Sequence, residues 1–134
     1  MLRPPIEPML ARLSRELPGG AYCYEPKWDG FRCLAFVSGG EVDLRSRHQR
    51  PLARYFPEVT RALADVGREQ FVLDGELVIA RQSGFDFPAL LGRLHPAASR
   101  VERLAREMPA TFVAFDTLAA GDDDLRAKPF AVRR

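Results

Sequence analysis

Residues 25–32 gather several side chains that could act together on a phosphate group. The segment reads Glu-Pro-Lys-Trp-Asp-Gly-Phe-Arg, so Lys27 stands among two carboxylates, a glycine and Arg32. A neutral lysine amine is a nucleophile, and an arginine guanidinium binds phosphate oxygens through paired hydrogen bonds. The same residue types are also typical of a solvated turn, because Asp-Gly is a common turn dipeptide. The spacing alone therefore supports two interpretations equally: a site that reacts with phosphate, and an exposed turn.

Lys27 can act as a nucleophile only after it loses a proton. The pKa of a free lysine is about 10.4, roughly three units above neutral pH, and this difference corresponds to about 4 kcal/mol. Burial and the charge of Arg32 would lower the pKa of Lys27, whereas the carboxylates of Glu25 and Asp29 would raise it. The sequence leaves open which influence prevails.

Three other stretches carry residues whose types bear on function. The most basic stretch, residues 45–50, is typical either of an exposed loop or of a phosphate contact. The apolar stretch 71–80 carries Asp74 and Glu76 two positions apart, which places both on one face of a strand. Carboxylates in so apolar a strand are costly unless they are paired or bind metal. Phe115 lies in the third of these stretches, the apolar residues 111–118, where an aromatic residue by itself indicates core packing.

The hydrophobic pattern predicts the elements that would carry these groups. Strands are predicted over residues 21–25, 31–37, 41–46, 71–80 and 111–118, and helices over residues 8–17, 55–66, 86–94 and 97–108. Residues 38–40, Ser-Gly-Gly, predict a hairpin turn, and Pro129 predicts the start of a further helix. Lys27 would then lie on a loop held by a strand on either side.

The order of these groups resembles that of the covalent nucleotidyltransferases, the superfamily of ATP-dependent DNA ligases, RNA ligases and mRNA capping enzymes. Four motifs follow the family order, namely the lysine motif at 25–32, Ser-Arg at 46–47, Asp-Gly-Glu at 74–76 and Phe-Asp at 115–116. The phrase at 5–10, Pro-Ile-Glu-Pro-Met-Leu, looks most like small bacterial DNA ligases associated with repair. The resemblance covers essentially the whole chain.

The resemblance implies a role for each candidate residue. In the family the motif lysine attacks the α-phosphate of ATP and becomes lysyl-AMP, and this role falls on Lys27. Mg²⁺ or Mn²⁺ is the implied metal. The other implied roles are nucleotide binding by Glu25, Arg32, Glu76 and Phe115, phosphate and DNA binding by Ser46 and Arg47, metal binding by Glu76, and support from Asp29, Gly30 and Asp74.

The implied fold is α+β, the ATP-grasp-like nucleotidyltransferase fold of DNA ligase adenylation domains, with antiparallel sheets flanked by helices. Residues 1–134 would form the N-terminal part of that domain. The family's later features, a second metal-binding glutamate, a lysine pair and an oligonucleotide-binding domain, are not found in the sequence. A length of 134 residues with 46% hydrophobic content fits one domain with one core.

The implied function is the sealing of nicks in double-stranded DNA during repair and recombination, together with other repair proteins. Two alternatives stay open: a catalytically incompetent ligase fragment that only binds nucleotide or DNA, and an RNA ligase or capping-type nucleotidyltransferase. The near balance of 20 basic and 18 acidic residues does not by itself identify a nucleic-acid-binding protein.

A cytoplasmic location without a membrane partner is expected. No apolar run approaches the ~20 residues of a membrane span, and the N-terminus lacks the apolar core of a secretory signal. Cys23 and Cys33 are too few for a disulfide framework, and their places in predicted strands indicate small buried apolar residues.

Overall fold

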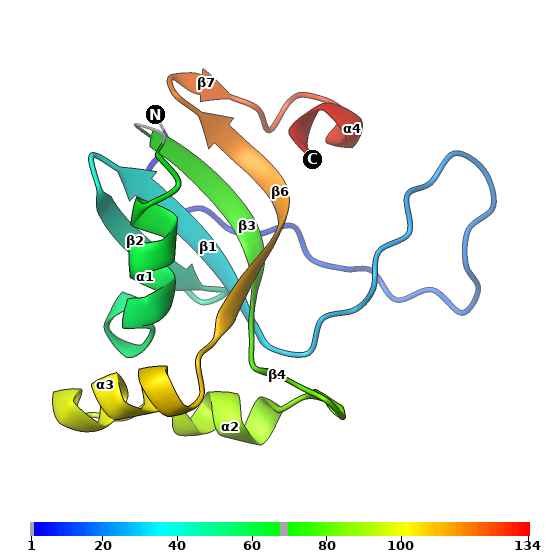
Figure 1. Cartoon of the computed structure of the whole chain (residues 1–134). Helices are drawn as coiled ribbons and strands as arrows, with labels where there is room; N and C mark the ends of the chain where they lie inside the picture. Colours follow the sequence, from blue (N-terminus) through cyan, green and yellow to red (C-terminus); the bar gives the residue numbers. More distant parts are fainter. Residues whose placement is uncertain (1, 68–69) are drawn as a thin grey trace.

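An antiparallel five-stranded sheet forms the centre of the structure, a computed structural model that describes residues 2–67 and 70–134 (Figure 1). Its strand order is β2-β1-β3-β6-β7, with bounds β1 Phe31–Ser38, β2 Glu41–Ser46, β3 Gln70–Val78, β6 Thr111–Ala120 and β7 Asp123–Asp124. A separate hairpin follows β3, made of β4 Ala80–Arg81 and β5 Gly84–Phe85. The helices are η1 Ala53–Tyr55, α1 Pro57–Ala64, α2 Phe87–Gly92, α3 Ala98–Glu107 and α4 Phe130–Arg133. Within the described ranges, none of them is long and apolar enough to cross a bilayer.

The two faces of the sheet carry different kinds of residue. One face packs against α1 and α2, and its core includes Cys33, Ala35, Val37, Leu44, Phe56, Phe71 and Leu77. The other face holds a smaller apolar cluster of Leu34, Phe36, Val72, Leu118 and Ala119, which packs against Leu2 and Ile6. Because side chains alternate along a strand, Arg32 of β1 and Asp74 and Glu76 of β3 share this second face. The charged candidate residues therefore lie on the face opposite α1.

Most of the predicted elements are confirmed, with small shifts at their ends. Gly39 and Gly40 form the predicted hairpin turn, both with positive φ, as this kind of two-residue turn requires. Asp86 caps α2, because its carboxylate accepts a hydrogen bond from the backbone N–H of Ala89 at 2.9 Å. The predicted last helix is confirmed as α4, which begins directly after Pro129.

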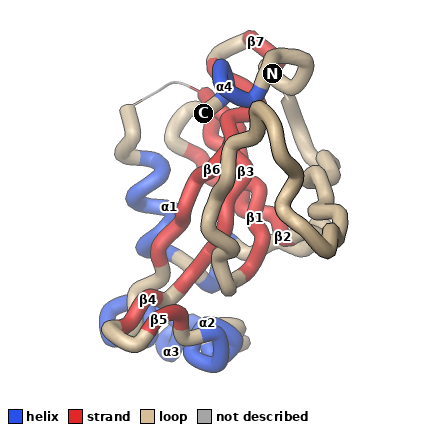
Figure 2. Tube along the Cα trace, turned by 90° about the vertical axis from the view of Figure 1, so that its right-hand side faces the viewer, coloured by secondary structure: helices blue, strands red, loops and turns tan. Residues whose placement is uncertain are grey.

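The segment from residue 7 to residue 30 contains neither helix nor strand. The helix predicted over 8–17 and the strand predicted over 21–25 are therefore wrong. Leu13 is 97% exposed, so the apolar stripe that predicted the helix faces no partner surface. A helix of this length needs such packing, since short isolated helices are marginal in water. Figure 1 shows the segment on the side of the sheet away from α1, and Figure 2 shows it in front of the strands.

The two cysteines have different environments. Cys33 is buried in the core as predicted, and burial raises the pKa of its thiol far above the ordinary value. Cys23 is exposed on the irregular segment, so its predicted burial is wrong for the same reason as the missing strand.

A buried arginine joins the helices that pack on the core. The side chain of Arg93 is fully buried and forms two hydrogen bonds with the carboxylate of Glu58, at 2.7 and 2.9 Å. Its guanidinium also donates to the backbone carbonyls of Met108 at 2.9 Å and Tyr55 at 2.8 Å. Glu58 in turn accepts from the backbone N–H of Ala110 at 2.8 Å. The network ties the start of α1 to the ends of α2 and α3.

Gly75, in the middle of β3, leaves no room for a larger side chain. A Cβ at this position would lie 2.5 Å from the carbonyl oxygen of Val113 and 2.6 Å from the ring of Phe112. We expect Gly75→Ala to lower the free energy of unfolding by about 1–3 kcal/mol, the usual cost of overpacking, in urea denaturation. Gly92→Ala in α2 is the matched control, since a Cβ there meets no atom within 4 Å. Equal losses in the two variants would contradict the steric explanation.

Candidate functional site

Lys27 lies on the irregular segment, close to the point where β1 begins. Its side chain is 87% exposed. The predicted strand before it is absent, so the loop is held by a strand only on its C-terminal side. Gly30 brings the chain against the end of β3, because a Cβ there would lie 1.9 Å from the carbonyl oxygen of Leu77. Only glycine permits this approach, which sets where Lys27 lies relative to the sheet.

The nearest charged partner of Lys27 is Asp29. The Lys27 Nζ donates to Oδ1 of Asp29 at 2.5 Å. This hydrogen bond and the negative charge of Asp29 raise the pKa of Lys27 above its ordinary value, with a smaller contribution from Glu76. Of the opposing influences that the sequence left open, the carboxylates therefore prevail in this structure. Lys27 has to lose its contact with Asp29, or have that charge offset, before it becomes a nucleophile.

Asp29→Asn is expected to lower the pKa of Lys27, because the substitution removes the negative charge that stabilises the ammonium form. Competitive labelling with acetic anhydride over a pH series measures this, with Lys128, the other lysine of the chain, as internal reference. The labelling curve of Lys27 should move to lower pH while that of Lys128 stays in place. Asp65→Asn, an exposed residue at the end of α1, is the matched control. An unchanged Lys27 curve would show that Asp29 does not hold its proton.

Arg32, Asp74 and Phe115 form a compact group on the sheet face that also carries Glu76, whose charge acts on Lys27. Arg32 binds both carboxylate oxygens of Asp74, at 2.6 and 2.7 Å, and Asp74 is 3% exposed. The hydrogen bond to Asp74 raises the pKa of Arg32. The guanidinium also lies 4.7 Å from the centroid of the Phe115 ring. The buried carboxylate predicted in this strand is therefore paired with an arginine, and the arginine covers one face of the aromatic ring.

Glu76 is the second carboxylate of β3 and lies directly opposite Arg32 in the pairing with β1. Burial raises the pKa of Glu76, and the charge of Arg32 and the backbone of Gly30 oppose this rise. The described residues include no group of three or more His, Cys, Asp or Glu side chains arranged to hold a metal. Mg²⁺ is usually bound by one or two carboxylates together with substrate phosphates. One half-buried carboxylate beside Lys27 fits that pattern, and metal binding by Glu76 stays a prediction.

Three predicted site residues lie outside this group. Glu25 forms an ion pair with Arg134 at 2.8 Å. Ser46 holds the turn after β2, because its hydroxyl accepts from the backbone N–H groups of residues 48 and 50 at 3.3 and 3.1 Å. Arg47 is exposed and forms no side-chain hydrogen bond within the described part of the chain. Phosphate binding by Ser46 and Arg47 therefore stays a prediction.

Two contacts near the site were not predicted from the sequence. Trp28 packs against Phe85, with ring centroids 5.4 Å apart. Asp116 pairs with Arg133 of α4 at 2.6 Å, and burial raises the pKa of Asp116. A tryptophan among charged loop residues was the available signal for the first contact, because so large an apolar ring seeks a partner. The second joins residues 17 positions apart and had no such local signal.

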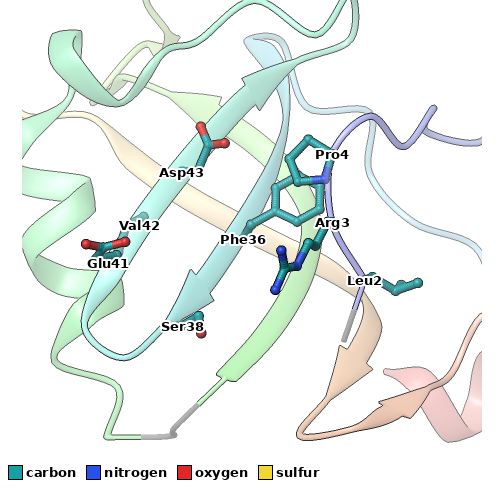
Figure 3. Close-up of a pocket in the computed structure, with 8 residues that line it drawn as sticks. All are labelled: Leu2, Arg3, Pro4, Phe36, Ser38, Glu41, Val42 and Asp43. Carbon is teal, nitrogen blue, oxygen red and sulfur yellow. The ribbon is translucent and has the colours of Figure 1, made fainter.

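An open hollow lies on another part of the molecule. It has a volume of about 450 Å³ and lies between the N-terminal residues and the β1–β2 hairpin (Figure 3). Its lining consists of Leu2, Arg3, Pro4, Phe36, Ser38, Glu41, Val42 and Asp43. None of the candidate site residues lines it, so the hollow is separate from the group around Lys27.

Comparisons with known proteins identify the family. Residues 6–134 match the family described as "ATP dependent DNA ligase domain". DNA ligase C of Mycobacterium tuberculosis is 51% identical over 98% of this chain and 36% of its own length. DNA ligase C1 of Mycolicibacterium smegmatis is 50% identical over 99% of this chain and 40% of its own length. The chain thus spans little more than a third of these relatives.

Solved structures agree with the fold. A mycobacterial DNA ligase D complexed with ATP and MES has a TM-score of 0.63 and 31% identity, over 82% of this chain and 33% of that chain. The ligase domain of M. tuberculosis LigD has a TM-score of 0.62 and 33% identity over the same shares. These likenesses confirm the predicted α+β fold of a ligase adenylation domain. The chain belongs to the ATP-dependent DNA ligase family.

Proposed function

We propose that this chain is the nucleotide-accepting part of an ATP-dependent DNA ligase and that Lys27 becomes covalently attached to AMP. The observation that carries the proposal is the placement of Lys27 beside a sheet face that holds Arg32 with Asp74, Glu76 and Phe115. These residues supply an amine, a fixed cation, a half-buried carboxylate and an aromatic surface within one group. A nucleoside triphosphate offers a partner for each of them: the α-phosphorus for the amine, oxygen atoms for the cation, a phosphate-bound metal for the carboxylate and the base for the aromatic ring.

In the proposed reaction, Nζ of Lys27 attacks the α-phosphorus of ATP. The new N–P bond forms as the bond from this phosphorus to the oxygen that bridges the β-phosphate breaks, and pyrophosphate leaves. The amine loses one proton before the attack and a second as the N–P bond forms. Both protons pass to water, because the Asp29 carboxylate, whose Oδ1 lies 2.5 Å from Nζ, stabilises the ammonium form and must move away or be offset before the first proton is lost. A divalent metal held by Glu76 would offset the negative charge of the phosphates.

The other candidate residues would bind the nucleotide. The face of Phe115 that Arg32 leaves open can stack on the purine, a contact worth about 1–3 kcal/mol for bases on aromatic side chains. Arg32 and Glu76 would hold the ribose. Glu25 would contact the amino edge of adenine, after exchanging its present partner, Arg134, for the base.

Later steps would follow in a complete ligase, for which residues 1–134 form the N-terminal part of the adenylation domain. AMP would pass to the 5′-phosphate of a DNA nick, and a 3′-hydroxyl would then displace AMP and seal the strand. Ser46 and Arg47 would hold these phosphates. A relative from Pseudomonas aeruginosa, 38% identical over 63% of this chain, is a multifunctional non-homologous end joining protein, which supports a role in DNA repair.

Binding of nucleotide or nicked DNA without AMP transfer is a second candidate function. The observation that favours it is the contact between Lys27 and Asp29, which keeps the amine protonated. The chain also spans little more than a third of its relatives, so groups that assist transfer in them can lie outside the shared region.

Labelling with ATP that carries a radioactive α-phosphate separates these functions. The protein is incubated with Mg²⁺, and covalent label is detected after denaturing electrophoresis. The proposed reaction predicts label that mild acid releases, as expected of an N–P bond, and that excess unlabelled GTP does not displace. Nucleotide binding without covalent label would favour the second function, and competition by GTP would favour a capping-type enzyme.

A further inference from the structure

Two aromatic pairs attach the turn after Lys27 to a neighbouring segment. The ring of Trp28 lies 5.4 Å from that of Phe85 in β5, with the planes tilted by 58°. The ring of Phe31 lies 5.6 Å from that of Phe87 in α2, with the planes nearly perpendicular. Tilted and perpendicular rings at these distances attract each other through their quadrupoles. The turn is therefore held at both of its ends.

Phe85 is held in place by the structure on either side of it. The backbone N–H of Asp86, the next residue, donates to the carbonyl of Ile79 at 2.8 Å and closes the β4–β5 hairpin. The carboxylate of Asp86 caps α2 through the backbone N–H of Ala89 and pairs with Arg81 of β4. The hairpin and the helix are thus joined at the residue that follows Phe85, which makes its ring a fixed support.

The chain before Trp28 makes no aromatic contact of this kind; its links to the rest of the described structure include the ion pair of Glu25 with Arg134 at 2.8 Å and a hydrogen bond from Arg32 to the carbonyl of Met9 at 3.3 Å. Every residue from 9 to 27 is exposed, and Trp28 is the first partly buried residue after them. Lys27 is therefore the last residue of the exposed segment, directly next to the residue that attaches to Phe85. Any movement of Trp28 is passed to Lys27 through a single peptide unit.

We propose that Phe85 is a positioning residue for Lys27, a role that rests on the proposed function of Lys27 as nucleophile. Through Trp28, the Phe85 ring fixes the backbone beside Lys27 and limits the positions from which Nζ can reach a bound α-phosphate. A displacement of about 1 Å at a reacting group can lower the rate by about 100-fold. Losing the ring contact should therefore slow the attack more than it weakens ATP binding.

Phe85→Ala tests this role, and Trp28, the chain's single tryptophan, reports the contact by its fluorescence. We expect Phe85→Ala to increase quenching of Trp28 by acrylamide. The rate of covalent labelling at saturating ATP should fall by about 10- to 100-fold, whereas the half-saturating ATP concentration changes less than about twofold. Phe85→Tyr, which keeps the ring, should restore both measurements. Leu91→Ala, at a 50% exposed residue of α2, is the matched control and should resemble the unchanged protein.

The proposal is overturned if Phe85→Ala leaves Trp28 quenching unchanged, or if quenching increases while the labelling rate stays at the unchanged protein's value. Thermal melts check folding, and Phe85→Leu replaces Phe85→Ala if the alanine variant does not fold. Failure of the unchanged protein to become labelled would count against the proposed function alone. The ratio of Lys27 to Lys128 acetylation needs no ATP and then decides the positioning: a ratio altered by Phe85→Ala supports it, and an unaltered ratio overturns it.

Discussion

Lys27→Arg is expected to reduce covalent labelling by ATP to background, a loss of more than about 1,000-fold. The substitution keeps the positive charge and much of the length of the side chain. A guanidinium has a pKa above about 12, so it stays protonated and cannot supply the free electron pair that attacks phosphorus. The present contact of Lys27 with Asp29 can persist in the variant, since arginine also pairs with a carboxylate. Electrophoresis after incubation with α-labelled ATP and Mg²⁺ measures the effect.

Lys128→Arg is the matched control, because Lys128 is the other lysine of the chain and lies outside the candidate site. It should retain the full covalent label. Thermal melts of both variants should match the unchanged protein, since Lys27 is largely exposed and contributes no packing. Label that persists in Lys27→Arg and disappears in Lys128→Arg would move the nucleophile to the second lysine. Label lost in neither variant would exclude a lysyl phosphoramidate.

The elements that the sequence predicted correctly include those whose apolar residues are buried in the two cores of the sheet. β1 and β3 pair with each other along their whole length, and their apolar residues face the two cores. In residues 8–17 the apolar pattern is just as regular, yet the side chains of Met9, Leu10, Leu13 and Leu17 are 58–97% exposed. Hydrophobic periodicity indicates which residues would share one face of a helix. It does not show whether another part of the protein packs against that face, and a short helix without such packing is marginal in water.

The sequence predicted which residue types form the candidate site, but it did not predict which of them contact one another. The sequence indicates that Asp74 and Glu76 share a face and that Asp74 needs a partner. The partner is Arg32, on a strand that is 42 residues away in sequence, and only the register of β1 with β3 places the two together. The pKa of Lys27 was undecided for the same reason, because its direction depends on which carboxylate approaches the amine.

Arg93→Met should destabilise the fold more than any surface substitution, by about 3–5 kcal/mol in the free energy of unfolding. Methionine fills much of the space of the arginine stem but leaves the partly buried carboxylate of Glu58 without its cation. It also leaves the backbone carbonyls of Met108 and Tyr55 without the guanidinium donors. Urea denaturation measures the loss. Arg103→Met is the matched control, since its exposed pair with Glu107 at 3.7 Å should contribute less than about 1 kcal/mol.

A double variant separates the buried charge from the packing. The stability lost in Arg93→Met can come from leaving the Glu58 carboxylate without a cation. In that case, adding Glu58→Leu should recover a large part of the free energy of unfolding. The recovery is incomplete, because the backbone N–H of Ala110 then loses its acceptor. If the two losses simply add, the ion pair contributes nothing beyond its separate contacts. Non-additive behaviour would show that the network acts as one unit, as groups in direct contact usually do. Because Arg93 and Glu58 form no hydrogen bond with a candidate site residue, loss of the network should lower stability more than it changes the labelling rate of the protein that remains folded.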